Sequence, residues 1–202
     1  MENPEPSHEE WILSQKLLWM DYARMIIPDF KVDDDNRQVI ADLFNYFLNI
    51  PGNLDLNKGL WLEGDLGTGK SSLMQIFSKF MIARQKGFLI HICSYIVTQY
   101  AIKGDIDRYT YNEREYSRRS PVCMCFDELG REPIPGNHFG QKINVMQHIL
   151  HVRYSLWQTE GLKTFVTTNL DADGIEELYD DYIRDRRKEM FNIIVLTGKS
   201  RR

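Results

Sequence analysis

Apolar residues recur at helical spacing in two stretches near the start of the chain. One helix is predicted over residues 9–25, before Pro28, and a second over residues 39–48, before Pro51 and Gly52. The acidic residues 33–35 are expected to cap the second helix. The apolar faces consist of Trp11, Ile12, Leu18, Trp19, Tyr22 and Met25 in the first helix and of Val39, Ile40, Leu43, Phe44, Phe47 and Leu48 in the second. Both faces need a partner surface, and the second helix is expected to pack on the domain that follows.

From residue 59 onward, short apolar runs alternate with helical patterns. The runs predict strands over residues 59–63, 88–95, 122–126, 163–168 and 191–196. Helices are predicted over residues 70–84, 96–102, 141–158 and 173–190, the last opened by a capping box of Asp173 and Glu176. This alternation predicts an α/β domain with a parallel sheet, and the chain length suits one domain of this kind.

Residues 64–71, Gly-Asp-Leu-Gly-Thr-Gly-Lys-Ser, match the phosphate-binding pattern GxxxxGK[ST] between a predicted strand and a predicted helix. Glycines allow backbone conformations that turn successive N–H groups toward a polyphosphate. Lys70 is expected to reach the β- and γ-phosphates and Ser71 to bind Mg²⁺. The predicted nucleotide-binding residues are Gly64, Asp65, Leu66, Gly67, Thr68, Gly69, Lys70, Ser71 and Ser72. A chance glycine-rich turn is the alternative, and the flanking strand and helix argue against it.

Two further strands deliver polar side chains where they end. The apolar run 122–126 leads into Asp127 and Glu128, as in the second nucleotide motif, Walker B. Asp127 is expected to hold Mg²⁺ through water, and Glu128 to orient or deprotonate the attacking water. The strand over residues 163–168 leads into Asn169, which would reach that water or the γ-phosphate, unless it only caps a turn.

Composition places the chain among ordinary globular proteins. Its 202 residues are 43% hydrophobic, and its three cysteines show neither disulfide nor paired zinc spacing. We expect them to be core thiols in a reducing compartment. No apolar run reaches the roughly 20 residues of a membrane span, and the first residues lack the pattern of a secretory signal. A soluble, cytoplasmic protein is therefore expected.

Charge is unevenly distributed, although the net charge is only −4. Residues 1–36 carry nine acids and three bases, whereas residues 184–202 carry seven bases and two acids. This asymmetry suits head-to-tail self-association or a basic surface for nucleic acid, and solvated charged faces are the simpler explanation. Residues 103–120 interleave tyrosines with arginines, a pattern that single-stranded nucleic acid can use. Four acids in the same segment nearly cancel its bases, so an exposed helix or loop is the better prediction there.

The segments GLWLEGDLGTGKSS, CFDELGREP, RYSLW, TFVTTNL and DYIRDRRKEMFNIIVLTGKSRR, in this order, resemble the DnaC-like AAA+ ATPases. That family includes replicative helicase loaders and IstB-like transposition helpers. The resemblance covers residues 35–202 and leaves residues 1–34 as a short helical extension that suits partner binding. It implies an α/β P-loop NTPase of the ASCE type, with a parallel five-stranded sheet flanked by helices and no C-terminal lid domain.

The same resemblance implies roles for individual residues. Lys70 and Ser71 correspond to Walker A, Asp127 and Glu128 to Walker B, and Asn169 to sensor 1. Arg186 is the first candidate for an arginine finger and Arg184 the second. The chain departs from the family at Tyr182, where a first arginine of an RxRxR-like helix is expected, and its N-terminal region lacks zinc-type cysteines.

An arginine finger acts across a subunit boundary, so a ring or filament of subunits is expected. The favoured function is a Mg²⁺-dependent ATPase that couples ATP binding and hydrolysis to single-stranded DNA, a replicative helicase or a transposase. A small-molecule P-loop kinase is the alternative, with Arg184, Arg186 and Arg187 as lid arginines, although a water-activating Glu128 disfavours it. A nucleotide-bound adaptor that hardly hydrolyses is a third possibility. A GTPase is disfavoured because no NKxD motif occurs.

Overall fold

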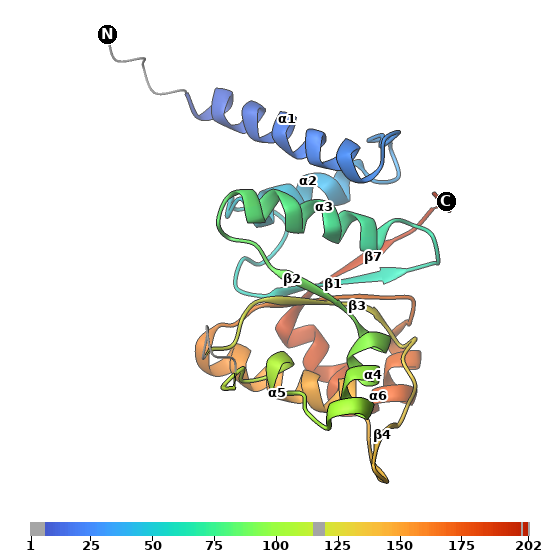
Figure 1. Ribbon diagram of the computed structural model, residues 1–202. Helices are drawn as coiled ribbons and strands as arrows, with labels where there is room; N and C mark the ends of the chain where they lie inside the picture. Colours follow the sequence, from blue (N-terminus) through green and yellow to red (C-terminus); the bar gives the residue numbers. More distant parts are fainter. Residues whose placement is uncertain (1–6, 115–119, 199, 202) are drawn as a thin grey trace.

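A computed structural model describes residues 7–114, 120–198 and 200–201. Its centre is a five-stranded sheet in which every neighbouring pair of strands is parallel, as the sequence predicts. The strands follow the order β2 (Leu89–Ile92), β3 (Met124–Leu129), β6 (Thr164–Thr168), β1 (Gly59–Gly64) and β7 (Phe191–Leu196). Because β6 lies between β1 and β3, the ends of these three strands meet at one edge of the sheet (Figure 1).

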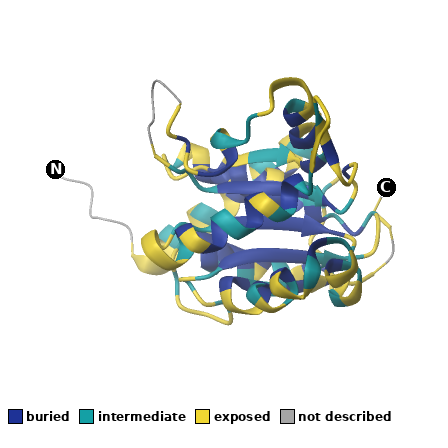
Figure 2. Ribbon diagram, turned by 90° about the horizontal axis from the view of Figure 1, so that it is seen from below, coloured by how far each residue is buried: buried dark blue, intermediate teal, exposed yellow. Residues whose placement is uncertain are grey.

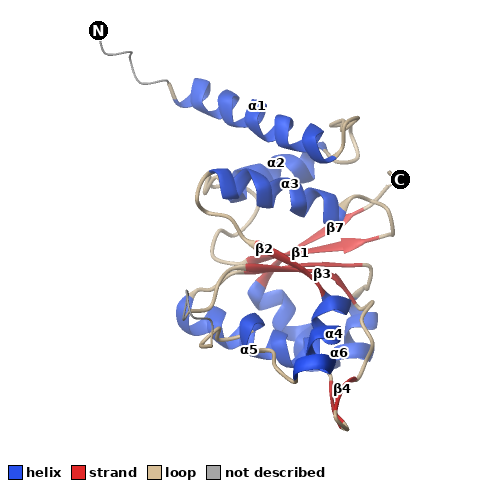
Figure 3. Ribbon diagram, in the orientation of Figure 1, coloured by secondary structure: helices blue, strands red, loops and turns tan. Residues whose placement is uncertain are grey.

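Helices cover both faces of the sheet (Figure 3). One layer contains α1 (His8–Ile26), α2 (Arg37–Phe47) and α3 (Lys70–Ala83), and the other contains α4 (Cys93–Lys103), α5 (Val145–Glu160) and α6 (Ala172–Met190). A short 3₁₀ helix, Asp107–Tyr109, follows α4. Only residues 197, 198, 200 and 201 are described beyond β7, so the described part of the chain has no helical lid after the sheet.

Alternating side chains of the strands supply two separate cores. Leu60 and Leu62 of β1 pack with the α1, α2 and α3 layer, whereas Trp61 packs with the α4, α5 and α6 layer. Phe165 and Val166 of β6 divide between the layers in the same way. The inner strands β3, β6 and β1 are consequently buried from both sides, with exposed residues on the outer helix faces (Figure 2).

Helix α1 packs on α3. Ser7 and Glu10 form a capping box at its start, with hydrogen bonds of 3.3 and 2.8 Å between each side chain and the other residue's backbone N–H. Trp19 is buried against Phe30 and Phe77, with ring centroids 5.6 and 5.2 Å apart. The core therefore includes part of the segment that the sequence predicts as an N-terminal extension.

Two predicted boundaries are wrong because apolar runs do not distinguish a strand from a helix. The strand predicted over residues 88–95 ends at Ile92, and α4 begins directly at Cys93. The helix predicted over residues 141–158 begins at Val145, capped by Asn144, whose side chain accepts a bond from the Gln147 N–H at 3.2 Å. Residues before it form an unpredicted antiparallel hairpin of β4 (Gly136–His138) and β5 (Gln141–Ile143).

The predicted helix caps also need correction. Asp171 caps α6 in place of Asp173, since its carboxylate accepts the Gly174 N–H at 2.9 Å. Asn36 precedes α2, and the acidic residues before it form a turn in which Asp33 accepts backbone N–H groups. Helix α6 is interrupted at Asp180, where φ is +82°.

The polar segment 103–120 is described in part. Tyr109 is buried, and Arg114 pairs with Asp105 at 3.0 Å, so these groups are satisfied within the chain. Tyr116, Arg118 and Arg119 lie outside the described residues. Within the described ranges, no helix is both long and apolar enough to cross a membrane.

A buried ion pair joins α6 to β1. Arg187 is 4% exposed and donates to the Glu63 carboxylate at 2.5 Å, while the Trp61 indole N–H donates to the same oxygen at 3.1 Å. The Arg187 guanidinium also lies over the Trp61 ring, 5.3 Å from its centroid. Because Glu63 is the second-last residue of β1, directly before the phosphate loop, this pair holds the strand that positions the loop.

Arg187→Ala is expected to lower the free energy of unfolding by roughly 3 kcal/mol, since it leaves the largely buried Glu63 carboxylate without its charge partner. Urea denaturation measures this change. Adding Glu63→Gln should restore part of the loss, and the exposed Lys188→Ala is the control. If the free energy of unfolding of Arg187→Ala lies within about 0.5 kcal/mol of the wild-type value, as is usual for surface substitutions, the pair has no stabilising role.

Candidate nucleotide-binding site

The phosphate loop connects β1 to α3, as predicted. Its glycines adopt left-handed or related conformations, with φ of +135° at Gly64, +85° at Gly67 and +97° at Gly69. Neighbouring chain also leaves no space for a side chain at two of them, because a Cβ would lie 2.1 Å from the Leu196 carbonyl oxygen at Gly64 and 2.3 Å from the Ser200 hydroxyl at Gly67. Gly69 directly precedes the first residue of α3, so the loop delivers a ligand to the helix N-terminus.

Lys70 is folded back over this loop. Its ammonium group donates to the carbonyl oxygens of Gly64 and Asp65 at 2.7 and 2.8 Å and lies 3.4 Å from the Thr68 hydroxyl. Burial lowers the pKa of Lys70, and the carboxylates of Asp65, Asp127 and Glu128 oppose that shift. The ammonium group is thus a buried cation held at the mouth of the loop, where a phosphate can exchange with these carbonyls.

A chain of hydrogen bonds links three elements beside Lys70. The Ser71 hydroxyl on α3 donates to Asp127 Oδ1 at 2.7 Å, and the Thr167 hydroxyl on β6 donates to the same oxygen at 2.5 Å. Thr167 also accepts the backbone N–H of Glu128 at 3.0 Å. The buried Asp127 carboxylate is therefore fixed directly against the Ser71 hydroxyl. Thr167 was not assigned a role from the sequence; its position two residues before Asn169 was the available signal.

Glu128 has an unusual backbone. Its φ is +59°, and the pairing of β3 with β6 shifts register between Phe126 and Leu129. This bulge separates the directions of the two adjacent acids, so that Asp127 points to Ser71 while Glu128 lines the neighbouring cavity. Arg131 pairs with the Glu128 carboxylate at 3.3 Å.

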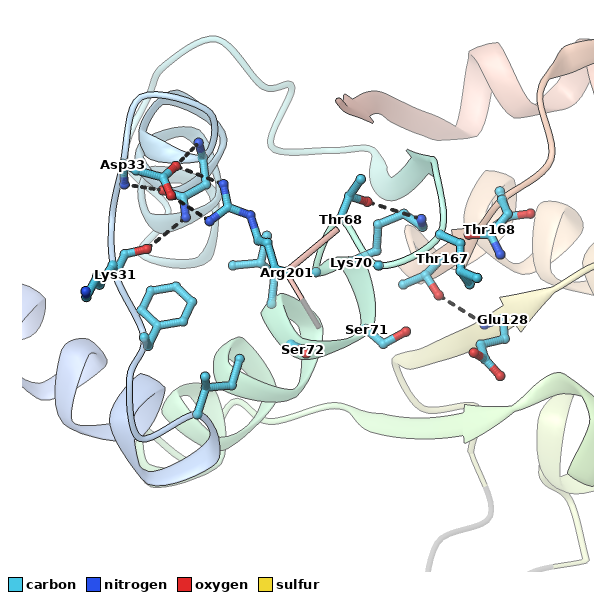
Figure 4. Close-up of a pocket in the computed structure, with 18 of the residues that line it drawn as sticks. Lys31, Asp33, Thr68, Lys70, Ser71, Ser72, Glu128, Thr167, Thr168 and Arg201 are labelled. Atoms are coloured by element: carbon cyan, nitrogen blue, oxygen red, sulfur yellow. Dashed lines mark hydrogen bonds and ion pairs between the residues drawn. The ribbon is translucent and has the colours of Figure 1, made fainter. Parts of the chain in front are cut away.

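A cavity of about 340 Å³ extends from the phosphate loop to the segment between α1 and α2 (Figure 4). Its lining includes seven of the predicted nucleotide-binding residues, from Leu66 to Ser72, together with Glu128 and Asn169. Gly64 and Asp65 contribute carbonyl oxygens to Lys70 instead. The opposite wall contains Ile27, Asp29, Phe30, Lys31, Asp33 and Asn36, which the sequence did not identify as part of a site.

Arg201 closes the rim between these two walls. Its guanidinium donates to both oxygens of Asp33 at 2.7 and 2.8 Å, and its backbone N–H donates to the Gly67 carbonyl at 2.9 Å (Figure 4). The bond from Arg201 lowers the pKa of Asp33 to about 2. The acidic and basic ends of the chain thus meet within one molecule, a contact that uneven charge alone did not predict.

The three arginines of α6 lie elsewhere. None of them is among the described residues that line the cavity. Arg186 pairs with Glu189 at 2.7 Å and lies between the rings of Tyr154 and Tyr182, 5.0 Å from each centroid. Arg184 pairs with Glu176, and Arg187 is buried on Glu63. Neither Arg184 nor Arg186 serves the cavity of its own chain in this conformation.

The donor set suits a nucleoside triphosphate with Mg²⁺. The loop offers backbone N–H groups and a buried ammonium group for phosphates, and Ser71 with Asp127 offers two adjacent oxygen ligands. Among the described residues, no group of three or more His, Cys, Asp or Glu is placed to hold a metal ion. A cation here would complete its shell with water and phosphate oxygens, as Mg²⁺ does in phosphoryl-transfer sites.

Comparison with solved structures identifies similar folds. A DnaI structure superposes with a TM-score of 0.62 at 22% identity, covering 89% of this chain and 93% of that one. The DnaC helicase loader gives a TM-score of 0.59 at 16% identity, covering 85% and 96% of the two chains. The replication initiator DnaA bound to AMPPCP and single-stranded DNA gives 0.55 at 16% identity, covering 85% of this chain and 49% of that one.

Sequence comparison contributes no assignment, because no protein-family model and no curated protein matches the chain. The superposition with DnaI and DnaC nevertheless extends over 89% and 85% of this chain. The protein has the fold of a DnaC-like AAA+ domain.

Proposed function

We propose that this protein is a Mg²⁺-dependent AAA+ ATPase that couples its ATP cycle to single-stranded DNA and to a protein partner in DNA replication. The observation that carries the ATPase proposal is the bonded set of Ser71, Asp127 and Thr167 between Lys70 and Glu128 at one cavity edge. The shared fold with DnaI, DnaC and DnaA supports the replication role. A transposition helper with a transposase partner is the alternative within the same fold.

In this proposal each residue has a separate task. Lys70 leaves the loop carbonyls to bind the β- and γ-phosphates, and Ser71 and Asp127 hold Mg²⁺, which would neutralise charge on the transferring phosphoryl group. Glu128 accepts the proton of the attacking water, and Asn169 orients that water or the γ-phosphate. Arg131 pairs with the Glu128 carboxylate, so this ion pair has to break before Glu128 can accept the proton.

We further propose that residues 1–34 recruit the partner and residues 35–202 form the ATPase core. Helix α1 presents the exposed side chains of Leu13, Leu17 and Met25 away from the core, which suits docking of another protein. The kinase alternative receives less support, because Arg187 is buried in an ion pair and does not act as a mobile lid arginine.

Lys70→Ala and Glu128→Gln are each expected to lower the ATP hydrolysis rate by roughly 10²-fold or more, by removing phosphate binding and the general base. Phosphate release measures the rate, and titration calorimetry measures ATP affinity. Glu128→Gln should still bind ATP, whereas Lys70→Ala should bind it weakly. Loss of ATP binding in both variants would argue against Glu128 as the hydrolytic residue.

Arg186→Ala is expected to lose hydrolysis and to regain part of it when mixed with Lys70→Ala subunits. An intact Arg186 on the Lys70→Ala subunit can then serve the neighbouring ATP site, where an arginine finger contributes roughly 10³-fold or more. Steady-state rates across mixing ratios test this, and Arg184→Ala is the matched comparison. If the mixtures never hydrolyse ATP faster than the sum of the two separate variants, Arg186 does not act at the ATP site of a neighbouring subunit.

Arg201→Ala is expected to speed nucleotide dissociation by up to about fivefold, because a partly exposed ion pair contributes no more than about 1 kcal/mol. Stopped-flow release of a fluorescent ATP analogue measures the rate. Arg201→Lys, which keeps charge but loses the paired bonds to Asp33, should be intermediate. Unchanged release in Arg201→Ala would show that the rim contact does not restrict the nucleotide.

A further inference from the structure

The hairpin of β4 and β5 carries an aromatic side chain that the fold does not use. Phe139 lies at the turn of the hairpin and is 97% exposed. The hairpin extends beyond the layer of α4, α5 and α6, so its tip is presented away from the core (Figures 1 and 3). The described contact of the ring is with the adjacent His138, edge to face, with centroids 4.6 Å apart.

The backbone at this tip is also unfavourable for phenylalanine. Phe139 and Gly140 have φ of +45° and +91°, the pattern of a two-residue type I′ turn. Asparagine or glycine is favoured at the first of these positions, and a bulky residue there is strained. A ring that is 97% exposed gains little packing energy within the described residues, so an external contact is the simpler reason for a strained phenylalanine here.

The surroundings of the tip favour an anionic partner. Residues 93–103 and 133–145, which contain α4 and the hairpin, include no aspartate or glutamate, although the chain has 29 acids. The His138 ring binds the Ala101 carbonyl at 3.1 Å and so joins the hairpin to the end of α4. Exposed Lys103 and Lys142 lie on the two joined elements.

The acids next to the two stretches are already engaged, since Glu132 is buried and accepts the Gly130 N–H at 2.8 Å. Asp105 pairs with Arg114 at 3.0 Å and accepts the Asp107 backbone N–H at 2.9 Å. Asp107 accepts the backbone N–H groups of Glu113 and Arg114 at 3.2 and 2.9 Å. Their negative charge is therefore partly offset beside the basic end of α4.

We propose that the hairpin tip binds single-stranded nucleic acid, with Phe139 stacked on a base and Lys103 and Lys142 contacting phosphates. An exposed aromatic ring can stack on any base, and neighbouring positive charges can bind the phosphates of the same strand. This inference rests on the proposed function and assigns its nucleic-acid contact to one hairpin. The tip is connected to the ATP site, since β4 begins eight residues after Glu128 in the sequence.

Fluorescence anisotropy of a labelled oligothymidylate, with the full chain and a non-hydrolysable ATP analogue, tests the proposal. Phe139→Ala should weaken binding roughly 5- to 100-fold, the range for loss of one stacked base. Phe139→Trp should keep the affinity, and Phe139→Leu, which is apolar but not aromatic, should behave like Phe139→Ala. Ile82→Ala, an exposed apolar side chain at the end of α3 on the opposite helical layer, is the control.

Phe139→Asn separates binding from folding. Asparagine suits the turn, so this variant should unfold about 2 °C higher while losing DNA affinity like Phe139→Ala. Changing Lys103 and Lys142 to Gln together should reduce the slope of log affinity against log salt by about 1.4, as expected for two single-strand phosphate contacts.

The possible failures are distinguishable. Wild-type affinity in Phe139→Ala and Phe139→Asn would overturn the assignment of the tip and leave DNA binding in place. Loss of subunit assembly with unchanged DNA affinity would also overturn it and assign the tip to a protein contact. Wild-type protein that binds and hydrolyses ATP but binds no oligonucleotide would overturn both this inference and the DNA part of the proposed function.

Discussion

The hydrogen bonds that the Asp127 carboxylate accepts hold the parts of the site together. This carboxylate accepts hydroxyl hydrogen bonds from Ser71 on α3 and Thr167 on β6, and Thr167 in turn holds the backbone of Glu128. These bonds join elements that are far apart in the sequence. They are possible because β6 lies between β1 and β3, which brings the ends of three parallel strands to one edge.

The same edge is closed by segments from both ends of the described chain. Asp33 lies between α1 and α2, whereas Arg201 follows β7, and their ion pair spans the rim beside the phosphate loop. The close approach of Ser200 to Gly67 shows that the loop is shaped by the tail as well as by its prospective ligand. The position of the tail and the conformation of the phosphate loop are therefore physically connected.

Two non-glycine residues, one at this edge and one at the tip of the hairpin, have left-handed backbones with separate consequences. At Glu128 the conformation belongs to a bulge that directs adjacent acids to different places. At Phe139 it holds an exposed ring at a hairpin turn. Strain of this kind persists only where the surrounding structure enforces it, and it concentrates at functional positions. Both lie in one continuous segment of the chain, Glu128 within β3 and Phe139 in the turn between β4 and β5.

Local patterns along the chain predict the alternating α/β order, all five strands of the sheet and the phosphate loop, because periodicity and glycine spacing are local properties. They do not distinguish strand from helix at residues 93–95, and they miss the hairpin, whose Phe-Gly turn lacks the usual Asn-Gly signal. Three contacts emerge from the folded arrangement alone: Thr167 holds Asp127, Arg187 is buried on Glu63, and Arg201 pairs with Asp33. Each of these contacts joins residues at least 40 positions apart, and their partners are set by strand order and packing, which local patterns do not encode.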